Sequence, residues 1–444
     1  MALPEQTPAR APKPELTLFD STSLIVGIII GAGIYQMAPD IAKGVGGPWG
    51  VIGIWVLGGL LSFCGALSYA ELATTYPFEG GDYVYLNRAY GSWAGFLFAW
   101  AQFTVVRPGD IAVMAFAFGT YAKEVWNPFQ SPVLAQQVYA VAAASVLTLI
   151  NVLGVREGKW TQNLLTTAKA GGLLLVVVAA FSGGGAEASA AGNQGGGLPA
   201  SLALIFVLFT YGGWNEMAYV AAEVKDPRRN IGRALILGTA AVTVLYLLAN
   251  LAFLHALGYT GLAGSSAVAT ETVARVMPKS AAILVSVLVC VSALGAVNGL
   301  VFTGARISYA VGKDYRMFAA LGRWHPKFGT PAFALLLQGA IVVALIVILG
   351  TFVNAVLYTA ATVYSFYLAS SAAVLVLRRK EPNTPRPFQV PVFPAPTLLF
   401  CAVCVFLIHS AVVYKPVIAL VSLGLLVLGG LVWRITREGD RPPV

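Results

Sequence analysis

Apolar segments of about 20 residues recur along almost the whole of this 444-residue chain, and they constrain its fold more than any other feature. A helix of that length crosses the roughly 30 Å of hydrocarbon in a bilayer. Charged residues make up 11% of the sequence, whereas roughly a quarter is usual in a soluble domain. Backbone groups in hydrocarbon must be satisfied within the protein, which favours helices for segments this long. The sequence therefore predicts an all-α integral membrane protein surrounded by lipid bilayer.

Twelve apolar segments are long enough to be transmembrane helices. They lie at residues 17–43, 47–75, 92–121, 134–154, 159–182, 198–224, 229–257, 278–312, 330–350, 353–378, 396–412 and 414–435. The first ten form two groups of five, within residues 16–182 and 198–380. Because five is an odd number, the second group must be inverted relative to the first. The last two helices, within 396–436, fall outside this repeat.

The segments around these groups are polar or rich in glycine and proline. We predict a disordered cytoplasmic tail at 1–15, extracellular loops at 183–197 and 258–275, a proline-rich cytoplasmic linker at 381–395 and a cytoplasmic tail at 437–444. With both termini in the cytoplasm, most of the 28 lysines and arginines fall on the cytoplasmic side of the plasma membrane, as the positive-inside rule requires. The net charge of +9 follows this topology, so it does not indicate nucleic-acid binding.

Glycines interrupt the first segment of each group at matching depths, at Gly31 and Gly33 and at Gly212 and Gly213. Glycine costs about 1 kcal/mol inside a helix, and backbone freed within a membrane is tolerated only where it is buried or lines a wet cavity. A pair of glycine-broken segments in corresponding halves indicates a transporter's binding site near the bilayer midplane. The alternative is close helix packing, to which the GxxxG spacing of Gly27 and Gly31 is well suited.

A broken helix exposes free N–H groups that favour an anion and free C=O groups that favour a cation. The predicted carboxylate site is formed by the N–H groups of Ala32, Gly33 and Ile34. The predicted ammonium site is formed by the C=O groups of Ile29, Phe209 and Gly212. Together they would bind the zwitterionic backbone of an α-amino acid.

Bulky side chains gather around the two breaks and predict the pocket wall. These are Tyr35, Phe209, Trp214 and Asn215, with Phe209 as the expected gate. Simple packing is the alternative for the aromatic residues.

Lys169 is expected near the middle of the fifth segment. A lysine there costs roughly 2.5–3.5 kcal/mol on insertion scales, so it is treated first as functional. Its ammonium could replace a coupling sodium ion by binding carbonyl groups of the first broken helix. Alternatively, Lys169 pairs with Glu216 or extends to the cytoplasmic face.

Arg107 and Asp110 lie beside Pro108 in the third segment and can neutralise one another at i,i+3. They form either a structural ion pair or a substrate contact. Glu216, shortly after the second break, is either a proton carrier or an ion-pair partner.

No enzyme, metal or cofactor site is predicted. The three histidines, His255, His325 and His409, have no ligand spacing, and no nucleophile–base motif is present. The four cysteines lie in apolar segments and are interpreted as packing residues.

Several motifs, in this order along the chain, resemble those of the amino acid–polyamine–organocation (APC) transporters, above all their L-type amino acid transporter (LAT) branch. They are Gly27–Tyr35, Ser68–Leu72, Glu79–Tyr83, Val106–Gly109, Phe209–Asn215, Glu223–Asn230, Val297–Arg306 and Arg386–Pro391. The resemblance implies a LeuT-like fold of five plus five inverted helices, with helices 1 and 6 discontinuous and two helices added. It also implies sodium-independent transport of neutral L-amino acids, usually by exchange.

Two departures from the family pattern stand at the site. Ala32 replaces a more usual serine, and Glu216 replaces an uncharged residue, which leaves proton-coupled symport as an alternative. A non-transporting membrane sensor of amino acids is the alternative of another class. Animal members bind a glycoprotein subunit through a cysteine between helices three and four. Because residues 121–137 contain no cysteine, no disulfide-linked heavy subunit is expected.

Overall fold

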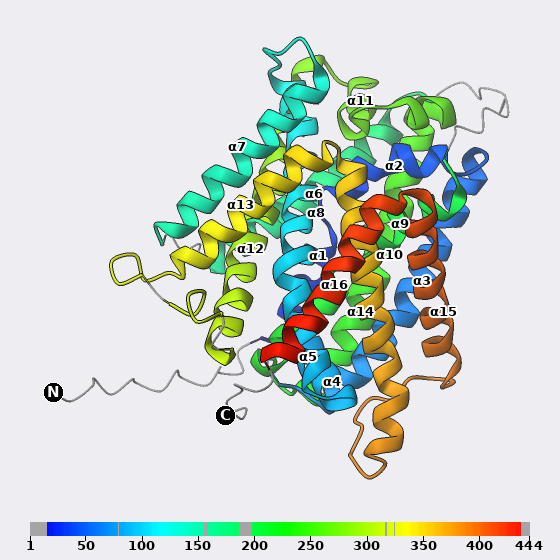
Figure 1. Cartoon of the computed structure of the whole chain (residues 1–444). Coiled ribbons are helices and arrows are strands. Elements are labelled where there is room, and N and C mark those ends of the chain that lie inside the picture. The colour runs from blue at the N-terminus through cyan, green and yellow to red at the C-terminus, as the bar shows by residue number, and fades with distance from the viewer. Residues whose placement is uncertain are drawn as a thin grey trace.

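The computed structural model of the chain describes residues 16–78, 80–154, 159–185, 198–315, 318–323 and 325–436. Throughout these residues the regular elements are helices, accompanied by two isolated β-bridges. Figure 1 shows most of them running side by side in one bundle. Among the described residues, eight helices are long and apolar enough to cross a membrane, and one bent helix pair passes the same test. The chain is a multi-pass membrane protein.

The long helices coincide with the predicted segments to within a few residues. They are α3 (Gly47–Thr75), α7 (Pro132–Val152), α8 (Lys159–Ser182), α10 (Pro227–Gly264), α12 (Lys279–Asp314), α13 (Ala332–Leu349), α14 (Phe352–Lys380), α15 (Ala395–Tyr414) and α16 (Pro416–Thr436).

Three predicted segments consist of more than one element. The first is α1 (Leu18–Ile29) and α2 (Gly33–Lys43), bent by 50°. The third is α5 (Ser92–Ala101), a π-helix η1 (Gln102–Val106) and α6 (Arg107–Val125). The sixth is α9 (Ala200–Thr210) followed by the 3₁₀-helix η2 (Trp214–Glu223). The breaks in the first and sixth segments are confirmed, whereas the π-helix in the third was not predicted.

Two short helices occupy opposite ends of the bundle, α4 (Asp82–Tyr90) and α11 (Val268–Ala274) (Figure 1). Gly258, with φ of 69°, interrupts α10, and the chain then continues as a further helical turn. The stretch 258–275, predicted as an extracellular loop, thus contains the end of α10 and helix α11.

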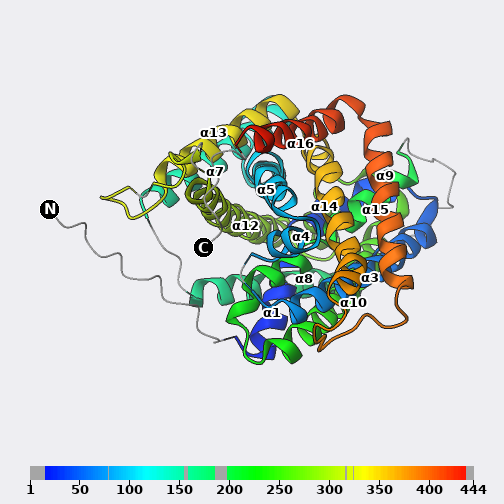
Figure 2. The same ribbon diagram turned by 60° about the horizontal axis from the view of Figure 1, so that its bottom comes forward.

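The last two helices lie at the margin of the bundle (Figure 2). Helix α15 packs on α14 and α3, and α16 packs on α14 and α5. The apolar window of α16 is 17% buried, against 56% for α3 and α14. Most of its apolar surface is therefore available to lipid, while α3 and α14 belong to the protein core.

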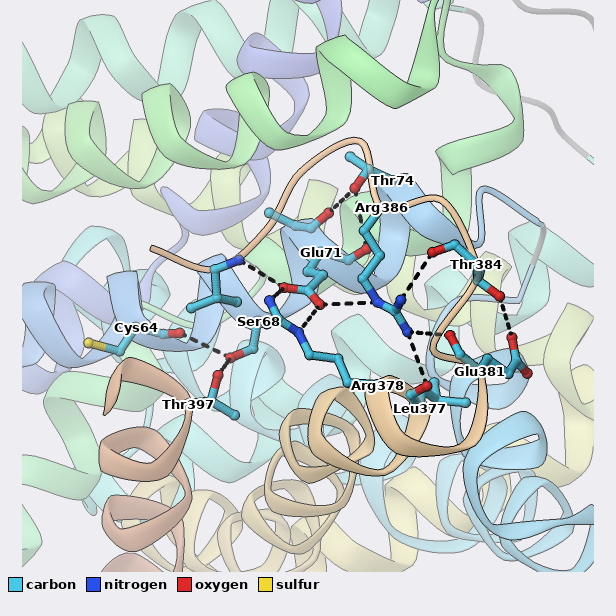
Figure 3. A network of polar contacts seen from close by, with 12 residues as sticks. Cys64, Ser68, Glu71, Thr74, Leu377, Arg378, Glu381, Thr384, Arg386 and Thr397 are labelled. Atoms are coloured by element: carbon cyan, nitrogen blue, oxygen red, sulfur yellow. Dashed lines mark hydrogen bonds and ion pairs between the residues drawn. The ribbon is translucent and has the colours of Figure 1, made fainter. Parts of the chain in front are cut away.

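The linker after α14 is anchored by one buried carboxylate, as Figure 3 shows. Glu71 of α3 accepts hydrogen bonds from Arg378 Nε at 2.7 Å and Nη2 at 2.6 Å, and from the Val390 N–H at 2.8 Å. Arg386 Nε lies 3.6 Å from the same carboxylate. This network joins the second segment, the tenth segment and the linker.

Candidate functional site

The first break places three unused backbone donors inside the protein. Helix α1 ends at Ile29 and α2 begins at Gly33, with Ala32 as its N-cap. The next two amides, of Tyr35 and Gln36, donate to the Ala32 carbonyl at 3.2 and 3.0 Å. Within the described chain, the N–H groups of Ala32, Gly33 and Ile34 donate to no backbone carbonyl. All three residues are buried, so the positive end of α2 offers free donors where the carboxylate site is predicted.

The second break lies directly against the first. The Gly212 N–H turns back to the Phe209 carbonyl at 3.0 Å, and Gly213 adopts a left-handed conformation with φ of 107°. A Cβ atom on Gly213 would lie 2.8 Å from Ile28 of α1. A Cβ atom on Gly33 would lie 3.5 Å from Thr210, the last residue of α9. The distance at Gly33 is ordinary van der Waals contact, whereas Gly213 permits the close approach of the two broken segments.

Tyr246 of α10 connects the carbonyl ends of the two breaks, and sequence reasoning did not identify it. Its hydroxyl donates to the Ile29 carbonyl at 2.7 Å and lies 3.4 Å from the Thr210 carbonyl. The Ile29 carbonyl also accepts the Gly31 N–H at 2.8 Å. A carbonyl oxygen has two lone pairs, so an ammonium bound there would have to displace one of these donors. The one available signal was a tyrosine in an apolar span, because a buried hydroxyl needs a partner.

Tyr35 lies in the first turn of α2 and is contacted by Tyr121 of α6. Its ring meets that of Tyr121 edge-on, with centroids 6.4 Å apart, and the Tyr121 hydroxyl reaches the Tyr35 carbonyl at 3.5 Å. Phe209, the predicted gate, is partly buried at the end of α9.

Trp214 and Asn215 open η2 and are held by α3 and α14. The Trp214 ring is 4.9 Å from that of Tyr69 and 5.2 Å from that of Tyr367. The Tyr367 hydroxyl donates to Asn215 Oδ1 at 2.9 Å. Both residues thus have defined packing or hydrogen-bond roles in addition to the predicted pocket role.

Lys169 lies beside the first break, in a cavity between α8 and α12. The cavity is lined by Ile30, Tyr35, Lys169, Gly172, Val285, Leu288, Val289 and Ser292. Among the described residues, no carboxylate lies within 4.0 Å of the Lys169 amine. Glu216, the acid considered as a partner of Lys169, contacts Arg107.

Arg107 and Glu216 form an ion pair between α6 and η2. Arg107 Nη2 and Glu216 Oε1 are 2.9 Å apart, with side chains 5% and 27% exposed. Asp110 was expected to neutralise Arg107 within the helix, but the carboxylate that contacts Arg107 is that of Glu216.

The π-helix that precedes Arg107 follows from Pro108, which has no N–H to donate to the Thr104 carbonyl. The Tyr358 hydroxyl of α14 fills that place at 3.1 Å. The Arg107 N–H bonds instead to the Gln102 carbonyl, five residues back. Sequence reasoning noted the proline but could not locate the compensating tyrosine.

A second buried carboxylate, Asp82 of α4, contacts η2 through Tyr219. It accepts hydrogen bonds from Tyr69, from Tyr219 at 2.8 Å and from Ser370 at 2.5 Å. Burial raises the pKa of Asp82, and the three hydroxyl donors oppose that rise. Asp82 belongs to a motif quoted above, but its role as a link between α3, α4, η2 and α14 was missed.

The start of α1 and the end of η2 are also joined through their backbones. The Leu16 N–H donates to the Glu223 carbonyl at 2.9 Å, and the Lys225 N–H donates to the Leu16 carbonyl at 2.8 Å. The two breaks, which hold the predicted carboxylate and ammonium groups, approach each other at Gly213 and Ile28. Lys169 lines a cavity with Ile30, and Arg107 pairs with Glu216 of η2.

The chain matches the family model described as "Amino acid permease" over residues 16–435. It is 32% identical to the human b(0,+)-type amino acid transporter 1 over 429 residues, which cover 94% of this chain and 87% of the relative. It is 30% identical to the mouse large neutral amino acids transporter small subunit 2 over 428 residues, covering 94% and 80%.

Proposed function

The chain belongs to the amino acid permease family, as a LAT-like member of the APC transporters, and on this premise we propose that it carries neutral L-amino acids across the plasma membrane by sodium-independent exchange. One observation carries the proposal. The first break presents N–H groups that donate to no backbone carbonyl, and the carbonyl groups of both breaks lie next to them inside the protein. Such a pair of opposed helix ends suits a carboxylate and an ammonium on one carbon atom.

The carboxylate is proposed to accept hydrogen bonds from Ala32, Gly33 and Ile34. The ammonium is proposed to donate to the carbonyls of Ile29, Phe209 and Gly212, and to displace the Tyr246 hydroxyl from Ile29. Because Ala32 has no hydroxyl, backbone donors alone bind the carboxylate in this scheme.

Alternating access is proposed to use the five-plus-five inverted repeat. The inner half-helices, α1 and η2, are linked through Leu16 and Glu223, which favours their moving as one unit. The ion pair of Arg107 with Glu216 holds η2 against α6 and would separate when the inner side opens. Glu216 is proposed to act as this ion-pair partner rather than as a proton carrier.

Sodium independence is proposed to rest on Lys169. Lys169 lines the cavity with Ile30, where a fixed cation could bind carbonyl groups of the first break. The chain is proposed to work without a disulfide-linked heavy subunit, since residues 121–137 lack cysteine.

The test uses purified protein in liposomes loaded with unlabelled leucine. Labelled leucine should accumulate inside them at the same rate in sodium and in choline buffer, and much more slowly in empty liposomes. Lys169→Ala should be recovered folded but exchange leucine at least about tenfold more slowly, because the helix break loses its fixed cation. Equal uptake into empty liposomes would refute exchange, and a requirement for sodium would refute the role of Lys169.

A further inference from the structure

Four basic side chains surround the start of α10 and have no acidic partner. This α10 basic patch consists of exposed residues, namely Lys225, Arg228, Arg229 and Arg233. Within the described part of the chain, none of them has a carboxylate oxygen within 4.0 Å. By contrast, Arg378 of α14 and Arg386 of the linker both lie against Glu71. The patch therefore offers cationic groups that the rest of the described chain leaves unused.

The patch lies at the end of α10 where positive charge is unfavourable. The N-terminus of a helix carries a partial positive charge that favours anions. The first turn of α10 nevertheless has no acidic residue and contains Arg228 and Arg229. Glu223 and Asp226 precede the helix, so residues 223–233 carry four positive charges against two negative ones. A bound anion would offset both the excess charge and the helix dipole.

The face of α10 that carries part of the patch continues as an apolar surface. Arg229 and Arg233 are followed at helical spacing by Leu237, Val244 and Leu251, which are 50%, 57% and 43% exposed. Measured along the helix, Val244 lies about 16 Å from Arg233, or half of the roughly 30 Å hydrocarbon layer. A cationic head followed by an apolar face of one leaflet's depth matches the headgroup and acyl chain of a phospholipid.

The patch also adjoins the joint between α1 and η2. The Lys225 N–H donates to the Leu16 carbonyl at 2.8 Å, and Phe19 in the first turn of α1 is 78% exposed. Exposed apolar rings beside exposed cations are typical of segments at the boundary between headgroups and acyl chains. The positive-inside rule assigns this end of α10 to the cytoplasmic leaflet.

We propose that the α10 basic patch binds the headgroup of an anionic phospholipid of the cytoplasmic leaflet, whose acyl chain lies along Leu237 and Val244. Basic residues beside a membrane helix attract anionic lipids, with a gain of about fivefold in affinity for each lysine or arginine. The bound headgroup holds Lys225 in its backbone bond to Leu16 and so stabilises the joint between α1 and η2. This site lies outside the two breaks, and lipid binding does not depend on the proposed exchange.

Native mass spectrometry of the full chain in neutral detergent tests the site with phosphatidylglycerol and with phosphatidylcholine of the same acyl chains. Wild-type protein should bind phosphatidylglycerol about tenfold or more in preference to phosphatidylcholine. In the double variant Arg229→Gln with Arg233→Gln, phosphatidylglycerol binding should fall about tenfold or more. Arg379→Gln with Arg434→Gln removes two other exposed arginines, at the ends of α14 and α16. This matched control should bind the lipid as wild type does.

Hydrogen–deuterium exchange tests the effect on the joint. Phosphatidylglycerol should slow the exchange of peptides that contain Lys225 in wild-type protein and have no such effect in the double variant. Unchanged exchange in wild type with the lipid bound would contradict the stabilisation of the joint.

The outcomes also separate lipid binding from transport. A protein that binds phosphatidylglycerol but exchanges no leucine would refute only the proposed function. Equal binding of the two lipids by wild type, or undiminished phosphatidylglycerol binding in the double variant, would refute the lipid site. Displacement of the lipid by inorganic phosphate would show that the patch binds a free anion, and would overturn the assignment to a lipid. If the double variant is not recovered folded, Arg233→Gln alone repeats the comparison, with an expected loss of about fivefold.

Discussion

At the scale of single residues, the Tyr246 hydroxyl donates to the Ile29 carbonyl, which the ammonium of the proposed substrate also needs. Its hydroxyl is one of two donors to Ile29, and its ring packs against Trp55 and Tyr211. The hydroxyl can therefore stabilise the empty site by donating a second hydrogen bond to the Ile29 carbonyl, beside that of the Gly31 N–H.

Tyr246→Phe should keep the ring packing and lose the hydrogen bond. We expect a lower melting temperature without substrate, because the Ile29 carbonyl keeps only the Gly31 N–H and the net loss of one hydrogen bond costs about 0.5–1.5 kcal/mol. Saturating substrate should then raise the melting temperature more than in wild type, since its ammonium fills the vacated position. Thermal unfolding with and without amino acid measures both effects. Tyr364→Phe, which removes a bond to the Ile205 carbonyl in α9, is the control, and an equal substrate shift in all three proteins would contradict this role.

The ion pair of Arg107 with Glu216 belongs to the same scale. Glu216→Gln would leave the guanidinium of Arg107, 5% exposed, without its carboxylate partner. Breaking a buried pair by removing one partner costs about 3–5 kcal/mol, and the partial exposure of Glu216 places the expected loss at the lower end. Unfolding in detergent should show this loss, and the double variant Arg107→Met with Glu216→Met should recover part of it. A Glu216→Gln protein as stable as wild type, but insensitive to a pH gradient, would support the proton role instead.

At the scale of elements, the second break depends on Gly213. Its left-handed backbone separates α9 from η2, and its missing side chain leaves room for Ile28. Without this approach, the free groups of the two broken segments would lie too far apart for one small zwitterion.

Gly213→Ala should therefore impair both stability and transport. A left-handed conformation costs alanine about 1–2 kcal/mol, and the added Cβ would lie 2.8 Å from Ile28. We expect a lower melting temperature and a loss of leucine exchange of at least about tenfold. Gly424→Ala in α16, where an added Cβ meets nothing within 4 Å, should leave exchange unchanged. Normal exchange by Gly213→Ala would show that the close approach is not needed.

At the scale of the whole molecule, segments distant in sequence are joined through a few buried carboxylates. Glu71 connects α3, α14 and the linker (Figure 3), and Asp82 connects α3, α4, η2 and α14. Asp82 is the first residue of α4, which lies at the end of the bundle opposite α11 (Figure 1). The two networks hold η2 and the linker against the same two long helices.

Glu71→Gln should loosen the linker without affecting the helix breaks directly. The Val390 N–H donates to Glu71, so its amide should exchange hydrogen for deuterium faster in the variant than in wild type. The melting temperature should also fall, because Arg378 and Arg386 lose their common carboxylate. Mass spectrometry of peptides from the 381–395 linker measures the exchange. Glu124→Gln, at an exposed position in α6, is the control, and unchanged linker exchange in Glu71→Gln would contradict the anchoring role.

The sequence alone determined the membrane class, the helical segments and the two broken ones, because hydrophobic length and glycine placement are local properties of the chain. It also predicted the family, which the comparisons confirm. The tertiary structure decided which polar groups meet. It paired Arg107 with Glu216 rather than Asp110, placed Tyr246 between two carbonyls and used Tyr358 to complete the π-helix. These contacts join residues 36 to 254 positions apart, so they depend on how helices pack across the bundle, which no local pattern in the sequence records.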